Sequence, residues 1–441
     1  IFSYSNTFSP GVLGPDNASN VQNTIVPSCN NNIGLVNLSN TCGTNPEILL
    51  TCFSQGTYNG VNRKLETILG IEHNFNNSSQ PTVYARAEET GSIWGLAWKN
   101  TTGDIFSSSF VKQYSGLKDG PGAVYKTSYN GSEYETSLFA DLSSLGVNVA
   151  PLINTDVQDC DYGTQVGKYG LGSIVLSPDE QWLYTINLSD NTLVKFSSTN
   201  PRTATTTITP IPDPGCSNGD ARAFALVFRG NDLYVGVTCT AETSSLNGGL
   251  PSDLELESSA NVFKYTPETG SWNLEFTTNY IKGYWRDNFE DSYKTVHWLT
   301  DLDFTDDGNM LISLSDRVGH RFCDDAERID GQNPDLLVVF QNAAGQWELE
   351  NNGQIMINGQ SVNGTGADNT EGPGGGEFFA YDHWITDPAY HRETALGSIV
   401  VLPGSGSVVA MVYDPIVSSY SGGMHRYNTS NGEKISAKEL Y

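Results

Sequence analysis

The sequence predicts an all-β protein: a single β-propeller of about six four-stranded blades, with an N-terminal extension. The composition favours strands and turns, because 45 glycines and many Ser, Thr and Asn residues accompany a charged fraction of only 17%. Short apolar runs with period-2 alternation recur along the chain, and turn residues separate them. Several first runs are rich in glycine and small residues, which suits the crowded innermost strands of a propeller.

The clearest unit is HWLTDLDFTDDGNMLISLSDRVGH, residues 297–320. An apolar run ends at Phe304, and a second alternating run begins at Met310. The polar stretch Thr305–Asn309 lies between them and contains Asp-Asp-Gly. Two period-2 runs around such a turn predict an antiparallel hairpin.

Similar units begin near Gly91, Leu171, Ala221 and Leu396, and each continues into a second hairpin. Strand–turn repeats of roughly 40 to 80 residues are typical of propellers. Counting from Pro46 gives about six units, so we expect a propeller over 46–441 and an extension over 1–45. Tandem β-sandwiches are the alternative, but they would not require small residues in every first strand.

The N-terminal extension contains a predicted strand, because Phe2, Tyr4 and Phe8 share one period-2 face. Residues 1–27 carry a single charge, Asp16. An unpaired strand needs a partner, which is either its own domain or a neighbouring subunit that receives it as an assembly arm. Because the chain begins with Ile rather than Met, we expect a processed product or a fragment.

The net charge of −27 argues against nucleic acid and anionic membranes as partners. No apolar run approaches the roughly 20 residues of a membrane span, so membrane insertion is not expected. The acidic surface also leaves carboxylates for Ca²⁺, the one cofactor that we consider.

The seven cysteines form no CxxC pair, which argues against a zinc site and favours an oxidising compartment. Cys216 and Cys239 flank the first two strands of one unit, so we predict a disulfide between them. Such a loop closure contributes about 3 kcal/mol in the chain-entropy model. One further bridge is expected among the three N-terminal cysteines, and the last pair could join two blades: Cys29, Cys42 and Cys52; Cys160 and Cys323.

The densest acidic group is Asp301, Asp303, Asp306 and Asp307. The Asp-Asp-Gly part is the turn that each unit needs, whereas Asp301 and Asp303 should share one face of a strand. We therefore restrict the Ca²⁺ hypothesis to Asp301 and Asp303. No catalytic motif supports acid–base chemistry by the histidines.

An aromatic loop between two units supplies candidate ligand or interface residues: Tyr284, Trp285, Phe289 and Tyr293. Such rings stack on sugars or meet another protomer, although the loop could equally pack on itself. Five sequons permit N-glycosylation, at Asn17, Asn37, Asn100, Asn130 and Asn428.

Several motifs occur in order from Pro46 to the C-terminus: DGPGAVYK, LSPDEQWLYTINLSDNTL, LTDLDFTDDGNMLISLSDRVGH, GPGGGEFF and LGSIVVLPGSGSVVAMVYDP. Together they resemble the propeller-like head of bacterial surface proteins that precedes serine–aspartate-repeat B-type and collagen-adhesin-like modules. A more distant resemblance is to extracellular appendage proteins such as mastigoneme components. The resemblance implies an extracellular, surface-exposed or filament-forming role, and it supplies no enzymatic activity to carry over to this chain. The chain departs from that pattern because it stops at Tyr441, where stalk modules would begin, and adds the segment 1–52.

The sequence therefore predicts a secreted, non-enzymatic structural propeller of a cell-surface layer or filament, which forms homo-oligomers or polymers. A carbohydrate-binding adhesin head and a Ca²⁺-dependent propeller hydrolase or lyase are the alternatives.

Overall fold

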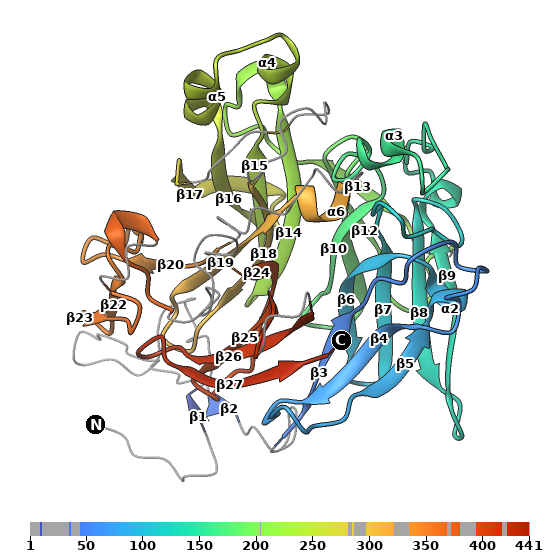
Figure 1. Ribbon diagram of the computed structural model, residues 1–441, viewed down its shortest axis with the longest axis horizontal. Coiled ribbons are helices and arrows are strands. Elements are labelled where there is room, and N and C mark those ends of the chain that lie inside the picture. The colour runs from blue at the N-terminus through green and yellow to red at the C-terminus, as the bar shows by residue number, and fades with distance from the viewer. Residues whose placement is uncertain are drawn as a thin grey trace.

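A computed structural model describes residues 9–10, 35–36, 45–202, 204–280, 285, 297–321, 335–367, 372–379, 394–416 and 421–440. These residues form an all-β structure in which six sheets follow one another along the chain (Figure 1). The sheets are arranged as the blades of a β-propeller, which confirms the predicted fold class. We number the blades 1 to 6 in chain order.

The bounds of the blade strands are as follows. Blade 1 contains β3 (Glu47–Thr51), β4 (Glu66–Glu72) and β5 (Thr82–Arg86), and blade 2 contains β6 (Ile93–Lys99), β7 (Asp104–Ser109), β8 (Ala123–Tyr129) and β9 (Tyr134–Asp141). Blade 3 contains β10 (Leu171–Leu176), β11 (Trp182–Asn187), β12 (Thr192–Ser197) and β13 (Thr207–Pro210), and blade 4 contains β14 (Ala221–Arg229), β15 (Asp232–Cys239), β16 (Ser259–Thr266) and β17 (Ser271–Thr278). Blade 5 contains β18 (His297–Phe304), β19 (Met310–Asp316), β20 (Leu336–Gln341) and β21 (Trp347–Leu349), and blade 6 contains β24 (Ala395–Val401), β25 (Ser407–Tyr413), β26 (Gly422–Asn428) and β27 (Lys434–Glu439).

Five blades have the predicted four strands, and blade 1 has three in the described part of the chain. Two small sheets lie outside the blades: β1 (Ser9–Pro10) with β2 (Leu35–Val36), and β22 (Gln354–Ile357) with β23 (Gln360–Asn363). The helices are short and lie in connections: α2 (Ala87–Thr90), α3 (Cys160–Gly163), α4 (Glu242–Leu246), α5 (Pro251–Glu257) and α6 (Val318–Arg321), with 3-10 turns at Leu142–Leu145, Ser217–Gly219 and Pro373–Gly375. No helix among the described residues is long and apolar enough to cross a membrane.

The hairpin at residues 297–316 forms as predicted, with β18 and β19 paired antiparallel. The turn is closed by hydrogen bonds at both ends: Thr305 N–H donates to Asn309 O at 2.9 Å, and Gly308 N–H donates to Thr305 O at 2.9 Å. Gly308 has a φ of +87°, a conformation that favours glycine. The Asp-Asp-Gly sequence therefore acts as the turn of blade 5.

The small residues of the first strands allow neighbouring blades to approach each other closely. A Cβ on Gly95 of β6 would lie 2.6 Å from the backbone nitrogen of Ile174 in β10. A Cβ on Gly397 of β24 would overlap the Thr300 hydroxyl and lie 2.5 Å from Ser315 Cβ. The crowding expected of innermost strands is confirmed at these positions.

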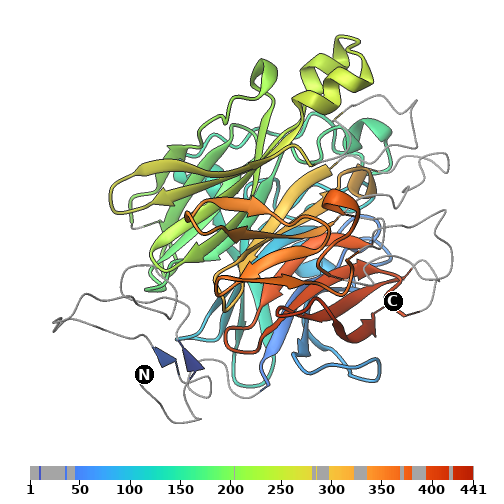
Figure 2. The same ribbon diagram turned by 90° about the vertical axis from the view of Figure 1, so that its left-hand side faces the viewer.

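Blade 6 and blade 1 lie side by side and close the ring (Figure 2). Among the described residues their strands belong to separate sheets, and side chains connect them. Leu50 and Ile71 of blade 1 pack with Val409 and Met424 of blade 6 in one buried cluster. His73 Nε2 lies 3.0 Å from Ser407 Oγ, and Arg426 donates to the carbonyl of His73 at 2.9 Å.

Candidate functional site

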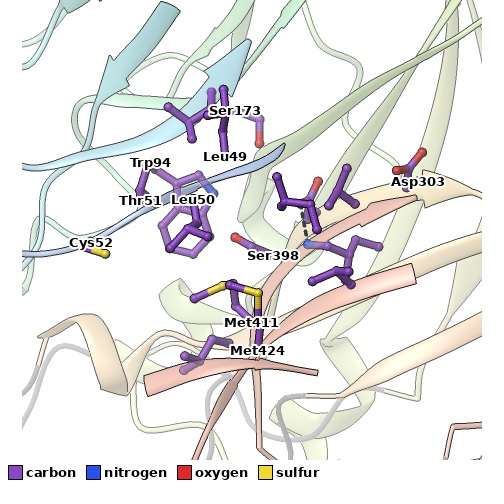
Figure 3. A pocket seen from close by; sticks show the side chains of 18 of the residues that line it. Leu49, Leu50, Thr51, Cys52, Trp94, Ser173, Asp303, Ser398, Met411 and Met424 are labelled. Atoms are coloured by element: carbon purple, nitrogen blue, oxygen red, sulfur yellow. Dashed lines mark hydrogen bonds between the residues drawn. The ribbon is translucent and has the colours of Figure 1, made fainter. Parts of the chain in front are cut away.

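The inner strands of all six blades surround a cavity of about 1050 Å³. Its walls are mainly aliphatic, with Leu49, Leu96, Val175, Val227 and Val400 each contributed by a different blade. Figure 3 shows Leu49, Leu50 and Thr51 of β3 on one side, across from Met411 and Met424 of blade 6. The volume is at the upper end of the roughly 300–1,000 Å³ that is usual for small-molecule sites, and most of the lining is apolar.

Acidic side chains of blade 5 bind the backbone of blade 6 along this cavity. Asp301 accepts hydrogen bonds from Ile399 N–H and from Leu302 N–H, both at 2.9 Å. Asp303 accepts from Val401 N–H at 2.7 Å and from Phe304 N–H at 2.8 Å. Each carboxylate thus uses one oxygen for its own strand and the other for β24.

Asp306 extends the same arrangement into the adjoining turn of blade 6. Its carboxylate accepts from Gly404 N–H at 2.6 Å and from Gly406 N–H at 3.2 Å. We call Asp301, Asp303 and Asp306 the carboxylate ladder. Backbone amides without a partner are costly when they are kept from water, so the ladder stabilises the edge of β24 that β25 does not cover.

The carboxyls of Asp301 and Asp303 titrate in a desolvated environment, although both residues line the cavity. Burial raises the pKa of Asp301 to about 8, and the nearby charge of Asp303 adds to the effect. Burial likewise raises the pKa of Asp303 to about 6. The hydrogen bonds from the backbone amides act in the opposite direction and favour the charged form.

The structure shows a scaffold role for Asp301 and Asp303, and the Ca²⁺ site predicted for them stays a prediction. All four carboxylate oxygens accept backbone N–H groups. A Ca²⁺ ion needs six to eight oxygens. Among the described residues no group of three or more His, Cys, Asp or Glu side chains is placed to hold a metal.

Lys112 and His320 form a second polar group, which lines one part of the same cavity. Lys112 Nζ donates to Gly319 O at 2.8 Å, lies 3.4 Å from His320 Nδ1 and lies 5.0 Å from the centre of the Phe53 ring. Desolvation lowers the pKa of Lys112 to about 8. Burial, followed by the charge of Lys112, lowers the pKa of His320 well below its usual value. No motif in the sequence distinguishes this pair, because its members are 208 residues apart.

The predicted disulfide between Cys216 and Cys239 is present and joins residues 23 positions apart. It connects the segment before β14 to the end of β15 in blade 4. Cys160 is also disulfide-bonded, and Cys52 is buried at the end of β3. Cys29, Cys42 and Cys323 lie outside the described residues.

Trp285 does not form the exposed ligand surface that we predicted for the aromatic loop. Its side chain is 1% exposed, its ring lies 5.5 Å from that of Trp298, and its indole N–H donates to His297 O at 3.3 Å. The Arg317 guanidinium lies 4.3 Å from the centre of the ring. The indole is part of the protein core, as expected of a loop that packs on itself. Tyr284, Phe289 and Tyr293 lie outside the described residues.

The remaining predicted residues are distributed over the surface or lie outside the described part. Asn100 and Asn130 are exposed, and Asn428 is half-buried in blade 6. The sequons at Asn17 and Asn37 and the arm residues Phe2, Tyr4 and Phe8 lie outside the described residues.

The six sheets and the mainly aliphatic central cavity define a β-propeller in which each blade is a continuous segment of the chain. No family model matches the sequence. The chain is similar to colossin-D of Dictyostelium discoideum, with 29% identity over 92% of this chain and 44% of that protein. It is also similar to colossin-C of the same organism, with 26% identity over 95% of this chain and 43% of that protein. The chain therefore spans less than half the length of these two relatives.

Solved structures show more distant similarity. The nidogen/laminin complex contains a chain with a TM-score of 0.44 and 8% identity, over 89% of this chain and 93% of that chain. The periplasmic gluconolactonase of Pseudomonas aeruginosa has a TM-score of 0.38 and 13% identity, over 89% of this chain and 97% of that chain.

Proposed function

We propose that this chain is a secreted, non-enzymatic structural propeller of a cell-surface layer or filament, in which copies are joined through the N-terminal strand. The observation that carries this proposal is the carboxylate ladder. A propeller enzyme would direct acidic residues into the channel, whereas Asp301 and Asp303 bind the backbone of the next blade. These two carboxylates of the channel thereby serve the scaffold.

Disulfide bonding supports a secreted location. The Cys216–Cys239 bridge and the bonded state of Cys160 are typical of proteins that mature in an oxidising compartment. The net charge of −27 favours solubility and makes contacts between like-charged copies unfavourable. Assembly would then need a dedicated contact, and the nearly uncharged N-terminal arm with Phe2, Tyr4 and Phe8 offers one.

Assembly of the full-length protein tests this function. We expect the wild-type chain to form polymers that are visible by negative-stain electron microscopy, and a chain lacking residues 1–24 to stay monomeric by light scattering. A finer comparison places one charge on either face of the arm. Tyr4→Asp should block assembly because Tyr4 shares the apolar face, and Ser5→Asp should not because Ser5 lies on the opposite face. Polymers that survive the deletion, or a wild-type chain that stays monomeric, would contradict the proposal.

The alternatives give different results in the same preparation. A Ca²⁺-dependent hydrolase or lyase would bind Ca²⁺ and melt at a higher temperature in its presence. An adhesin head would bind members of a glycan array. For the structural propeller we expect no rise in melting temperature with Ca²⁺ and no binding to the glycan array.

A further inference from the structure

Lys112 lines the central cavity, and among the described residues no carboxylate pairs with its ammonium group. Three partly buried lysines elsewhere in the ring do pair with a carboxylate, at 3.3 to 3.8 Å: Lys126 with Asp104, Lys168 with Glu242, and Lys264 with Glu275. The chain has 50 acidic residues against 23 Lys and Arg residues, so carboxylates are numerous enough to pair with every cation. An unpaired charge that is kept from water is costly, and Lys112 is therefore suited to an anionic ligand.

Two protein groups accept hydrogen bonds from the Lys112 ammonium. Nζ donates to Gly319 O at 2.8 Å and lies 3.4 Å from Nδ1 of His320. Burial and the charge of Lys112 lower the pKa of His320, so its ring is neutral; with the proton on Nε2, 3.1 Å from Ser315 Oγ, Nδ1 is an acceptor. The Phe53 ring at 5.0 Å attracts the cation but has no lone pair. An ammonium has three N–H groups, so one of them remains for an acceptor in the cavity.

The ammonium lies at the end of the cavity where the inner strand β6 begins. Its two neighbours Phe53 and His320 lie 6.3 Å and 5.2 Å from the ring of Trp94, the second residue of β6. Phe53, Lys112 and His320 also line a smaller cavity of about 240 Å³, so these side chains lie between the two cavities. Lys112 is thus part of an end wall of the larger cavity.

The rest of the larger cavity offers apolar surface that leads away from Lys112. From Trp94 to Trp98 the strand β6 rises by about 13 Å, and both tryptophans line the cavity. Trp98 is 47% exposed, and Val400 near the end of β24 is 39% exposed. An aliphatic chain that runs from the end wall towards Trp98 would cover this surface and remove it from water.

The acidic side chains of the cavity do not serve as counter-ions of Lys112. The carboxylate oxygens of Asp301 and Asp303 accept hydrogen bonds from backbone N–H groups. Figure 3 shows Asp303 on the far side of the cavity from Trp94. Burial lowers the pKa of Lys112 to about 8 with no carboxylate charge to oppose the effect, so the ammonium is the main form at pH 7.

We propose that the cavity binds a long-chain aliphatic carboxylate, whose head group accepts a hydrogen bond from Lys112 Nζ and whose chain covers the apolar wall towards Trp98. A charge-assisted hydrogen bond of this kind is stronger than a neutral one, and it removes the cost of the unpaired ammonium. A neutral hydrocarbon would leave the ammonium unpaired, and a small polar anion would leave the apolar wall in water. The site lies inside the ring, so the inference does not depend on assembly through the N-terminal strand.

Binding of cis-parinaric acid, a fluorescent long-chain carboxylate, to the full chain tests the proposal. Trp94 and Trp98 line the cavity, so the bound probe should emit when tryptophan is excited. Hexadecanoate should displace the probe. Decanoate should bind at least about tenfold more weakly, because it buries fewer methylene groups. Hexadecanol should also bind about tenfold more weakly than hexadecanoate, because it lacks the charge that pairs with Lys112.

Two variants separate the head-group contact from the contact with the chain. Lys112→Met should weaken hexadecanoate by about tenfold or more and leave hexadecanol unchanged, so the preference for the acid disappears. Lys264→Met removes a lysine that does not line the cavity and should leave both affinities unchanged. Val400→Trp should weaken both ligands, because it narrows the cavity at an exposed position that leaves room for refolding of neither strand nor turn. Circular dichroism and the melting temperature check that each variant is folded.

Three results would overturn the proposal. The first is a wild-type protein that gives no probe emission, or emission that hexadecanoate does not reduce. The second is an equal loss of hexadecanoate and hexadecanol in folded Lys112→Met, which would remove the head-group contact. The third is unchanged affinity in Val400→Trp, which would place the ligand outside the cavity. Each of these results leaves polymer formation, the test of the assembly role, unaffected.

Discussion

The carboxylate of Asp303 in blade 5 accepts a hydrogen bond of 2.7 Å from the backbone N–H of Val401 in blade 6. Two residues earlier on both strands, Asp301 accepts from Ile399 at 2.9 Å. A neighbouring β-strand would also meet alternate residues in this way. The side chains therefore take the place of strand pairing at the edge of β24, and they tie two blades that share no sheet.

We expect Asp303→Asn to lower the free energy of unfolding by about 1–3 kcal/mol. The amide keeps one acceptor oxygen, but its NH₂ group then faces either Phe304 N–H or Val401 N–H. Urea denaturation measures the change. Glu133→Gln is the control, because it removes one negative charge at an exposed position. Equal stability of the two variants would show that the ladder contributes little.

The ladder also predicts a dependence of stability on pH. The pKa of Asp301 is raised to about 8, above the value of about 3.9 for an unfolded Asp. The folded state therefore binds this proton more tightly, so the associated stability is complete below about pH 4 and is lost as the pH rises to about 8.

Melting temperatures from about pH 4 to pH 9 check this sign. In the wild-type protein this contribution makes the melting temperature fall as the pH rises towards about 8, and Asp301→Asn should remove that part of the pH dependence. Asp303→Asn should change the pH dependence of the melting temperature mainly below about pH 6, the raised pKa of Asp303. A difference between wild type and Asp301→Asn that is constant with pH would contradict the raised pKa.

Much of the fold was predictable from local pattern. Alternating apolar residues around turns such as Thr305–Asn309 gave the hairpins, because a strand with one buried face must alternate. Small residues such as Gly95 and Gly397 marked the inner strands, because the distance between blades leaves no room for a side chain. The disulfide of blade 4 was predictable because both of its cysteines flank one hairpin.

The roles of the acidic residues were harder to predict, because their partners come from distant parts of the chain. Asp301 and Asp303 looked like metal ligands, but their partners lie 98 residues away in β24. A backbone N–H has no sequence signature, so no pattern could identify it. Trp285 looked like a surface aromatic because its neighbours are charged, whereas its environment is formed by Trp298 and Arg317. The Lys112–His320 contact likewise joins residues that are 208 positions apart.

Gly397→Ala should be strongly destabilising. Gly397 has a φ of +82°, and an added Cβ would overlap the Thr300 hydroxyl and crowd Ser315. Strain and overlap together should cost about 3 kcal/mol or more, measured by urea denaturation. Gly270→Ala is the matched control, because Gly270 has a φ of +70° with no atom within 4 Å of an added Cβ. A similar loss in both variants would assign the cost to backbone conformation alone.

Removal of the Cys216–Cys239 disulfide should also destabilise the protein. For two residues separated by 23 positions, the chain-entropy model gives a loss of about 3 kcal/mol. The double variant Cys216→Ala/Cys239→Ala avoids an unpaired thiol and is compared with wild type by urea denaturation. Unchanged stability would mean that the contacts of blade 4 hold the two segments together without the bridge.

Lys112→Met should stabilise the protein near neutral pH, in contrast to most substitutions at the cavity wall. Desolvation lowers the pKa of Lys112 to about 8, so the folded state disfavours the ammonium that an unfolded chain keeps up to about pH 10.4. The loss of stability caused by burying this ammonium is complete below about pH 8. It disappears as the pH rises through about 10.4, the pKa of lysine in the unfolded chain. Methionine removes the penalty but also the hydrogen bond to Gly319, which leaves an expected gain on the order of 1 kcal/mol at pH 7.

The matched control for this prediction is Lys264→Met in blade 4. Lys264 lies 3.3 Å from Glu275, and this charge raises its pKa although burial opposes the effect. Loss of the Lys264 ammonium should therefore lower the free energy of unfolding slightly, by less than about 1 kcal/mol, at every pH at which Lys264 is protonated. Thermal melts of both variants between pH 7 and about pH 10 measure the contrast. If Lys112→Met is less stable than wild type at pH 7 and the deficit does not change with pH, then the ammonium contributes to the fold through its contacts with Gly319 and Phe53.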